Sequence, residues 1–299
     1  MGLILLTLFV LAAVYVQQRG EVRHEKFTRK LTDHSNLLAP INCLFYFFSK
    51  DTQSAYIDVD KFPELKILQD NWEMIRDEAT ALNNSAHIKA SADLDDLGFN
   101  SFFRTGWKRF YLKWYGANLK SAEQLCPKTL ALINQLPNVK GAMFTMLPPG
   151  ARLVKHRDPY AGSLRYHLGL ITPNSDECYI SVDGQKYSWR DGEAVMFDET
   201  FIHYAENKTD QNRIILFLDV KRPVDFIWVD WINEIFSRLV VAGSATKNIK
   251  GDKVGFLNRS FAYLYKIRVL GKKIKAFSKP LYYALQYGLY IALIYWIFF

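Results

Sequence analysis

Residues 150–173 read GARLVKHRDPYAGSLRYHLGLITP, and the second half of this stretch alternates between two kinds of side chain. Leucines and a tyrosine fall on one side of the alternation, and Arg165 and His167 fall on the other. A period of two residues is typical of a β-strand, because successive side chains point to opposite faces of a sheet. The stretch therefore predicts a strand with one apolar face and one face that carries a guanidinium and an imidazole.

Further short apolar runs surround this strand, so the predicted fold is mainly β. Turn-forming residues separate the runs, and Asp183-Gly184 is typical of a tight hairpin. The predicted strands are 142–147, 153–157, 163–171, 178–182, 185–189, 194–197 and 214–220, with another that begins at His203. Many short strands without helices between them predict a double-stranded β-helix, that is, a jelly-roll or cupin-like core, with helices at its flanks.

Two histidines and one aspartate in this region have the spacing of metal ligands. His156 and Asp158 are two residues apart on an extended chain, so both project to the same side. Two imidazoles and one carboxylate bind Fe(II) on one face and leave its other positions open. We therefore predict that His156, Asp158 and His203 are the metal ligands and form the catalytic centre. The alternatives are a surface ion pair between His156 and Asp158, and a structural histidine at position 203.

Arginines on two strands indicate an anionic ligand. Arg213 opens the strand RIILFLDV, and its planar guanidinium suits a carboxylate. If Arg165 and His167 faced solvent, they would form the polar side of an edge strand. If they face the barrel interior, the buried guanidinium needs an anion, which a bound carboxylate would supply. We favour the interior, because Arg213 also requires an anionic partner.

The charge of the chain is concentrated near its C-terminal end. The 299 residues include 38 basic and 30 acidic side chains, and basic residues cluster at 246–279, where Asp252 is the one acidic residue. An uncharged apolar run follows this cluster at once, which argues against nucleic acid as the partner. The three widely spaced cysteines exclude a disulfide framework and a zinc ribbon.

Both ends of the chain are apolar and predict membrane segments. Residues 281–299 carry no charge and, as a helix, would be about 28 Å long, close to the thickness of the hydrocarbon core. Residues 1–18 are expected to be an uncleaved anchor. Basic residues lie on the inner side of both segments, which predicts a central domain in the cytoplasm. The basic residues at 247–279 are expected to contact anionic lipid head groups.

These features divide the chain into five predicted regions. They are a membrane anchor (1–18), a membrane-proximal connector with supporting helices (19–137), the jelly-roll core (138–222), a helical basic segment (223–280) and a transmembrane helix (281–299). Within the connector, helical periodicity predicts one helix at 63–82 and another at 122–136 that Pro127 interrupts.

Residues 150–173, together with YSWRDGEAVMFDETFIHYAENKTDQNRIILFLDV at 187–220, resemble the aspartyl/asparaginyl β-hydroxylases, a family of Fe(II)- and 2-oxoglutarate-dependent dioxygenases. The resemblance implies that His156, Asp158 and His203 bind iron. It implies that Arg165 and His167 contact one carboxylate of 2-oxoglutarate and that Arg213 contacts the other. Thr145, eleven residues before the first ligand, occupies a co-substrate position where serine is more usual.

Within this family the bacterial lipid A hydroxylases are the most similar group, and they share the apolar ends. The resemblance implies that 2-oxoglutarate and O₂ are consumed, that succinate and CO₂ are released, and that C2 of a secondary acyl chain of lipid A is hydroxylated at the bacterial inner membrane. Animal aspartyl hydroxylases have no carboxylate at the position of Asp158, which weakens the transfer of their peptide substrate. Hydroxylation of protein Asp or Asn remains an alternative, as does a non-catalytic metal-binding barrel.

Overall fold

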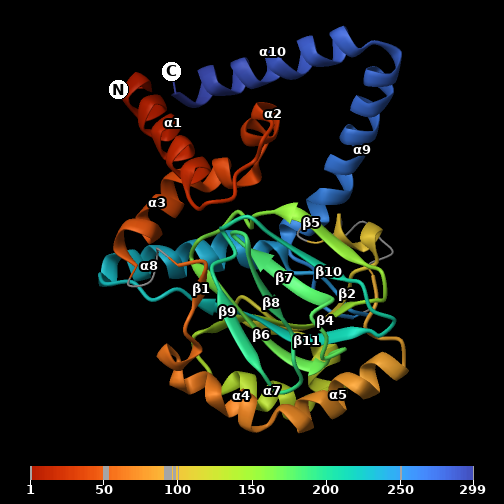
Figure 1. Cartoon of the computed structure of the whole chain (residues 1–299). Coiled ribbons are helices and arrows are strands. Elements are labelled where there is room, and N and C mark those ends of the chain that lie inside the picture. Colours follow the sequence, from red (N-terminus) through yellow and green to blue (C-terminus); the bar gives the residue numbers. More distant parts are fainter. Residues whose placement is uncertain are drawn as a thin grey trace.

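A computed structural model of the chain describes residues 2–49, 54–90, 96, 99, 101–249 and 251–298, of which 261–264, 266, 268 and 298 are described by their backbone alone. Two antiparallel sheets form the centre of the molecule (Figure 1). Helices cover one side of the larger sheet, and the two ends of the chain form helices that project from the opposite side (Figure 1).

The larger sheet has seven strands within the described residues, and it contains most of the buried apolar side chains. Their order is β1 (Tyr56–Ile57), β9 (Ala194–Phe197), β6 (Ser163–Ile171), β11 (Arg213–Lys221), β4 (Val139–Leu147), β2 (Lys108–Trp114) and β3 (Ala117–Asn118). The central strands β6, β11 and β4 are buried on both faces. Their inward face therefore has its polar side chains enclosed in the fold.

The smaller sheet faces the larger one and has the order β5 (Arg152–His156), β10 (His203–Asn207), β7 (Cys178–Val182) and β8 (Gln185–Ser188). Asp183 and Gly184 form the two-residue turn between β7 and β8, and both have positive φ, as the predicted hairpin requires. Two facing antiparallel sheets with helices at their flanks confirm the jelly-roll, cupin-like core.

Every strand predicted from the sequence is present, with small differences at its ends. The larger sheet also includes β1, β2 and β3, which precede residue 138 and were not predicted. The strand β2 pairs with β4 along most of its length. The larger sheet thus includes strands from residues 19–137, the region for which we predicted only a connector and supporting helices.

The helices before the core are shorter than predicted. The expected helix at 63–82 is divided into a 3-10 turn (Pro63–Leu65), α4 (Lys66–Asp70) and α5 (Trp72–Asn84), because the chain bends at Asn71. The predicted break at Pro127 is confirmed, and it separates α6 (Lys120–Leu125) from α7 (Pro127–Asn134). The helices α5 and α7 pack on the outer face of the large sheet, against β6 and β4 (Figure 1).

The remaining helices belong to the two ends of the chain. They are α1 (Gly2–Gln18), α2 (Phe27–Leu31), α3 (Ala39–Phe48), α8 (Ile227–Phe236), α9 (Phe256–Phe277) and α10 (Lys279–Phe298). The helix α1 packs against α3, and α10 contacts both α9 and α1. These contacts bring the two ends together on the same side of the sheets (Figure 1).

The prediction of membrane-spanning segments at 1–18 and 281–299 is corrected by the structure. None of the helices in the described ranges has both the length and the apolar character that crossing a bilayer requires. The helix α1 has 17 residues. The helix α10 contains Gln286 and several tyrosines, which interrupt its apolar sequence. Residue 299 lies outside the described residues.

Candidate metal and co-substrate site

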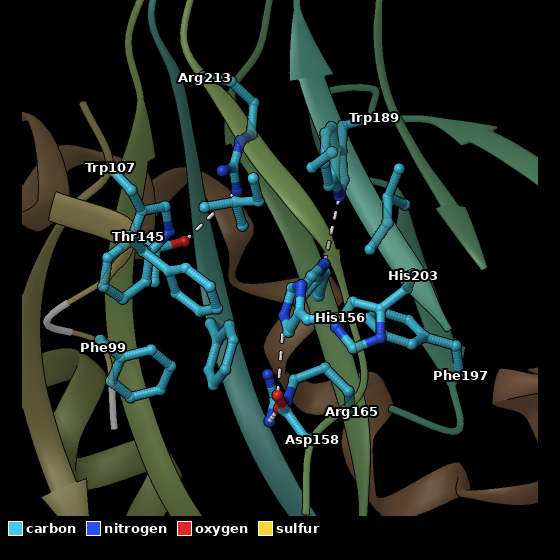
Figure 2. A pocket seen from close by; sticks show the side chains of 16 residues that line it. Phe99, Trp107, Thr145, His156, Asp158, Arg165, Trp189, Phe197, His203 and Arg213 are labelled. Atoms are coloured by element: carbon cyan, nitrogen blue, oxygen red, sulfur yellow. Dashed lines mark hydrogen bonds and ion pairs between the residues drawn. The ribbon is translucent and has the colours of Figure 1, made fainter. Parts of the chain in front are cut away.

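The three predicted metal ligands meet in one place between the two sheets (Figure 2). His156 ends β5, His203 begins β10, and the antiparallel register places them directly opposite each other. Their ring centroids are 4.2 Å apart. Asp158 follows β5, and one of its oxygens lies 3.7 Å from Nε2 of His156. One ligand atom from each of the three residues falls within 4.8 Å of the others, as a single metal ion requires.

Backbone carbonyl groups fix the orientation of both imidazoles. Nδ1 of His156 donates to the carbonyl oxygen of Val154 at 2.7 Å, and Nδ1 of His203 donates to that of Phe201 at 2.9 Å. Each ring therefore keeps a lone pair on Nε2 for a metal. Burial lowers the pKa of both histidines, to about 3 for His203, so the rings are neutral near pH 7. Neutral imidazoles are the form that binds a metal.

Asp158 is held in its ionised form. Burial alone would raise its pKa, but nearby positive charge, chiefly the guanidinium of Arg165, more than offsets this effect and lowers it. Nη2 of Arg165 donates to a carboxylate oxygen of Asp158 at 2.8 Å. The backbone N–H of Asp158 donates to the carbonyl oxygen of Glu199 at 2.9 Å. A fixed, ionised carboxylate beside two neutral imidazoles is the donor set that suits Fe(II).

Arg165 lies in the barrel interior, as predicted, but it is surrounded by carboxylates of the protein. Besides Asp158, it approaches Asp219 at 3.0 Å and Glu199 at 3.7 Å. Its guanidinium also lies 3.8 Å from the centroid of the Phe217 ring. From the sequence we expected a bound ligand to supply the anion that Arg165 needs, but the chain supplies that anion itself through Asp158. The predicted contact of Arg165 with 2-oxoglutarate stays a prediction.

Arg213 has the opposite environment, because no carboxylate pairs with it in the part of the chain that the structure describes. It is buried at the start of β11, where Nη1 donates to Oγ1 of Thr145 at 3.3 Å. Its guanidinium lies 4.5 Å from the Trp189 ring centroid. Burial without a compensating anion lowers the pKa of Arg213 to about 10. A carboxylate ligand beside Thr145 would supply the missing charge.

His167 lies between these two arginines on the inward face of β6. Nε1 of Trp189 can only donate, so Nδ1 of His167 accepts its hydrogen bond, at 3.4 Å. In the neutral ring the proton is then on Nε2, which has no partner among the described atoms. Burial lowers the pKa of His167 well below its usual value, and both arginines add to this effect. His167 thus presents an unused N–H to the cavity.

All seven predicted site residues line the same cavity (Figure 2). The aromatic side chains Phe99, Phe102, Trp107 and Phe217 form much of its apolar wall. The ring of Phe102 lies 4.7 Å from that of His156. Phe102 and Trp107 therefore contact the space in which a substrate would meet the metal. Phe110 and Tyr111, which are close to Trp107 in the sequence, are buried in the core and do not line this cavity.

Several residues of the site were not predicted from the sequence. The period of two residues along β11 could have identified some of them. From Arg213, every second residue of β11 points inward, which places Phe217 and Asp219 on the same face. Trp189 follows β8, outside any strand, so no alternation in the sequence relates it to Arg213 or His167. Glu199 sits in the turn before His203, where no period applies. The contacts of these two residues arise only in the folded chain.

The N-terminal region supports the turns that carry the predicted metal ligands. Nη1 of Arg157, the residue between His156 and Asp158, donates to the carbonyl oxygen of Val16 at 2.6 Å. The side chain of Asn42 bonds to the backbone of the loop after Asp158, donating to the carbonyl oxygen of Pro159 at 2.8 Å. Segments far apart in the sequence thus hold this loop from outside.

A second contact of the same region reaches the turn before His203. Arg19 donates to Oγ1 of Thr200 at 2.7 Å and pairs with Asp198 at 3.2 Å. Asp198 is fully buried and also pairs with Arg222 at 2.9 Å. Both turns that hold predicted metal ligands are therefore tied to residues 16–42.

Comparisons with known proteins agree with this geometry. The profile of the family described as Aspartyl/Asparaginyl beta-hydroxylase matches residues 69–223. The ornithine lipid ester-linked acyl 2-hydroxylase of Rhizobium tropici is 41% identical over 121 residues, which are 40% of this chain and 43% of the relative. The human aspartyl/asparaginyl beta-hydroxylase is 28% identical over 167 residues, which are 53% of this chain and 21% of the relative. The chain thus spans less than half the length of either relative.

A solved structure of a Pseudomonas putida prolyl-4-hydroxylase is also similar. It matches 62% of this chain and 100% of its own, with a TM-score of 0.36 and 16% sequence identity.

Proposed function

Because this chain belongs to the aspartyl/asparaginyl β-hydroxylase family, we propose that it hydroxylates C2 of a fatty acyl chain of lipid A with Fe(II), 2-oxoglutarate and O₂. The observation that carries the cofactor assignment is the pairing of a three-ligand site with a buried arginine that lacks a counter-ion. The observation that carries the substrate class is the 41% identity to an enzyme named as a lipid acyl 2-hydroxylase.

The residues of the cavity fit both groups. His156, Asp158 and His203 would hold Fe(II). Arg213 and Thr145 would bind one carboxylate of 2-oxoglutarate. Nε2–H of His167 would donate to the other carboxylate. When bound, Fe(II) and 2-oxoglutarate would activate O₂, so that one oxygen atom enters the C–H bond of the substrate and the other enters succinate, which is released with CO₂.

The chain itself contributes charge, orientation and a dry surface. Arg165 keeps Asp158 ionised and directed toward the two histidines. Carbonyl oxygens on Nδ1 hold both imidazoles with Nε2 toward the metal position. Phe102 and Trp107 provide an apolar wall at the same position, which suits an acyl chain and excludes water. These residues position the reacting groups, and the cofactors carry the oxidation.

We further propose that the enzyme acts at the bacterial inner membrane with its core in the cytoplasm. Lipid substrates are reached at a bilayer surface, and the basic residues at 247–279 suit anionic head groups. Lys250 and the side chains of Lys266 and Arg268 belong to this cluster but lie outside the described residues. No nucleic acid partner is proposed.

Mass spectrometry of lipids from cells that express the chain tests the proposal. We expect lipid A to gain the mass of one oxygen on an acyl chain, and we expect His156→Ala, expressed at the same level, to abolish this gain. If ornithine lipids gain the oxygen instead, the lipid A assignment is wrong but acyl hydroxylation stands. If lipids are unchanged and a cellular protein gains oxygen on Asp or Asn, the protein alternative is correct. Metal binding without succinate formation would indicate a non-catalytic barrel.

A further inference from the structure

The helix α8 and its continuation, a single π-helical turn at Ser237–Val241, are apolar on their outer face. Ile227, Trp231, Ile235 and Leu239 recur at every fourth position, with exposed fractions of 87%, 67%, 37% and 65%. The stripe that faces the protein also recurs at every fourth position, and it consists of Val229, Asn233 and Ser237. A surface helix ordinarily buries its apolar stripe and exposes its polar one. The polarity of α8 is largely reversed.

Specific hydrogen bonds fix this reversed orientation. Nδ2 of Asn233 donates to the carbonyl oxygen of Gly162 at 2.8 Å, and the hydroxyl of Tyr160 donates to Oδ1 of Asn233. Tyr160 also stacks on Phe236, with ring centroids 5.1 Å apart. Rotating α8 to bury Trp231 would break these bonds and leave their groups unpaired in the interior. The apolar stripe is therefore held outward by the fold.

Neighbouring aromatic side chains widen the stripe into a patch. Phe226 and Trp228 contact Phe48 at the end of α3, with ring centroids 5.3 and 5.2 Å apart. We call the whole patch the α8 apolar face, and it consists of Phe226, Ile227, Trp228, Trp231, Ile235 and Leu239. An exposed apolar patch of this kind marks an interaction site.

A positively charged cleft lies beside the α8 apolar face. It has a volume of about 420 Å³, and three basic side chains and one acidic side chain line it: Lys113, Lys140, Arg238 and Glu234. Glu234 pairs with Lys140 at 3.0 Å and with Arg238 at 2.8 Å. Lys113 has no ion pair within the described ranges, and burial and the nearby Lys140 lower its pKa. We call this site the basic cleft, and it has room and charge for an anion.

We propose that the α8 apolar face and the basic cleft form one surface that binds an anionic phospholipid bilayer. In this arrangement α8 lies in the plane of the lipid interface, and the basic cleft receives a lipid phosphate group. The inference rests on the proposed lipid substrate and adds the surface that presents the enzyme to it. Trp228 and Trp231 suit the polar–apolar boundary of a bilayer, where tryptophan is enriched.

Charge argues against a second copy of the chain as the occupant. A symmetric dimer places the same patch of both copies at one interface. The two basic clefts would then lie near each other, and their excess positive charge would be repulsive. An anionic bilayer matches both the apolar stripe and the positive charge beside it.

Fluorescence quenching locates α8 directly. The full chain is mixed with vesicles of phosphatidylcholine and phosphatidylglycerol whose acyl chains carry bromine, which quenches tryptophan only at close range. We expect the quenched amplitude to fall in the double variant Trp228→Phe/Trp231→Phe, and to persist in Trp72→Phe, which removes a tryptophan of α5. An unchanged amplitude in the double variant overturns the proposal. Because phenylalanine keeps the face apolar, we expect the double variant to bind the vesicles nearly as well as the unaltered chain. A change in quenching then reports the position of α8 relative to the acyl chains.

The basic cleft is tested by partitioning onto the same vesicles. We expect Lys113→Gln to weaken binding to vesicles with phosphatidylglycerol by about five-fold, as expected for one lysine at an anionic surface, and to leave binding to pure phosphatidylcholine unchanged. The matched control is Lys66→Gln, which removes an exposed lysine of α4. Equal effects of the two variants would contradict the assignment of the basic cleft.

Two further outcomes separate this inference from the proposed function. A chain that hydroxylates lipid while Trp228 and Trp231 remain unquenched overturns the bilayer surface and leaves the function standing. A chain whose tryptophans are quenched but that hydroxylates no lipid supports the surface alone. In sedimentation without vesicles, a dimer that Trp231→Ser dissociates would show that a second copy occupies the α8 apolar face, and it would also overturn the proposal.

Discussion

The guanidinium of Arg157 donates a 2.6 Å hydrogen bond to the carbonyl oxygen of Val16, which lies 141 positions earlier in the chain. Arg157 also approaches Asp33 at 3.4 Å. Since Arg157 stands between His156 and Asp158, these contacts fix the backbone that carries two of the three predicted metal ligands. The N-terminal helix is thus part of the support of the metal site.

We expect Arg157→Gln to weaken metal binding, because the turn would lose its attachment to Val16 and Asp33. Outer groups that orient metal ligands typically contribute 10–100-fold to affinity, and we expect a loss of about that size. Titration with Mn(II) or Co(II) in place of iron measures it without turnover. Arg152→Gln at the start of β5 is the matched control, because Arg152 is exposed. Unchanged affinity in Arg157→Gln would show that the turn holds its shape alone.

Removing the carboxylate ligand should have a larger effect. We expect Asp158→Ala to lose stable metal binding and to abolish succinate formation from 2-oxoglutarate, because one ligand is missing and Arg165 loses a 2.8 Å partner. Chelation of the metal from the unaltered chain should have the same result, and added Fe(II) should restore only the unaltered chain. Full turnover by Asp158→Ala would refute the three-ligand assignment.

Arg213 and Thr145 should determine the affinity for 2-oxoglutarate. We expect Arg213→Gln to raise the KM for 2-oxoglutarate by about 30-fold or more, since a buried charged partner of a carboxylate typically contributes at least 2 kcal/mol. Thr145→Val removes one neutral hydroxyl, and we expect an increase of about five-fold. Metal affinity measured with Co(II) should stay the same in both variants. A KM unchanged by Arg213→Gln would place the co-substrate elsewhere.

The sequence predicted the local parts of this molecule well. The alternation around Arg165 and His167 identified β6, and the spacing of His156, Asp158 and His203 identified three side chains that the fold does bring together. These signals follow from the geometry of a strand, which acts over a few residues. They were sufficient for the jelly-roll core and for the cavity.

Features that depend on distant partners were not predicted. No pattern near Arg165 shows that the carboxyl groups of Asp219 and Glu199 lie beside it, and none near Arg157 shows its bond to Val16. The membrane spans were predicted from the scarcity of charge at each end of the chain. That criterion gave too little weight to the length of α1 and to the polar side chains of α10. Local composition was a weaker guide than strand periodicity.

The buried carboxylate of Asp198 should make stability depend on pH. Burial alone would raise its pKa, but Arg222 and Arg19 more than offset this and lower it to about 2. A carboxyl group whose pKa is lower in the folded than in the unfolded chain stabilises the fold above its unfolded pKa of about 4, and this contribution is lost as pH falls toward 2. The difference of nearly two units corresponds to about 2 kcal/mol.

Urea unfolding of the unaltered chain and of Asp198→Asn at several pH values isolates this group from other carboxylates. At pH 7 we expect the variant to be less stable by at least about 2 kcal/mol, because Arg222 and Arg19 lose their shared anion in the interior. The difference between the two proteins should shrink as the pH is lowered from 5 to 3, since the carboxyl group binds a proton in the unfolded chain over this range but stays ionised in the folded chain. A difference that stays constant over this range would show that Asp198 stabilises the fold by its shape and hydrogen bonds and that its charge contributes nothing.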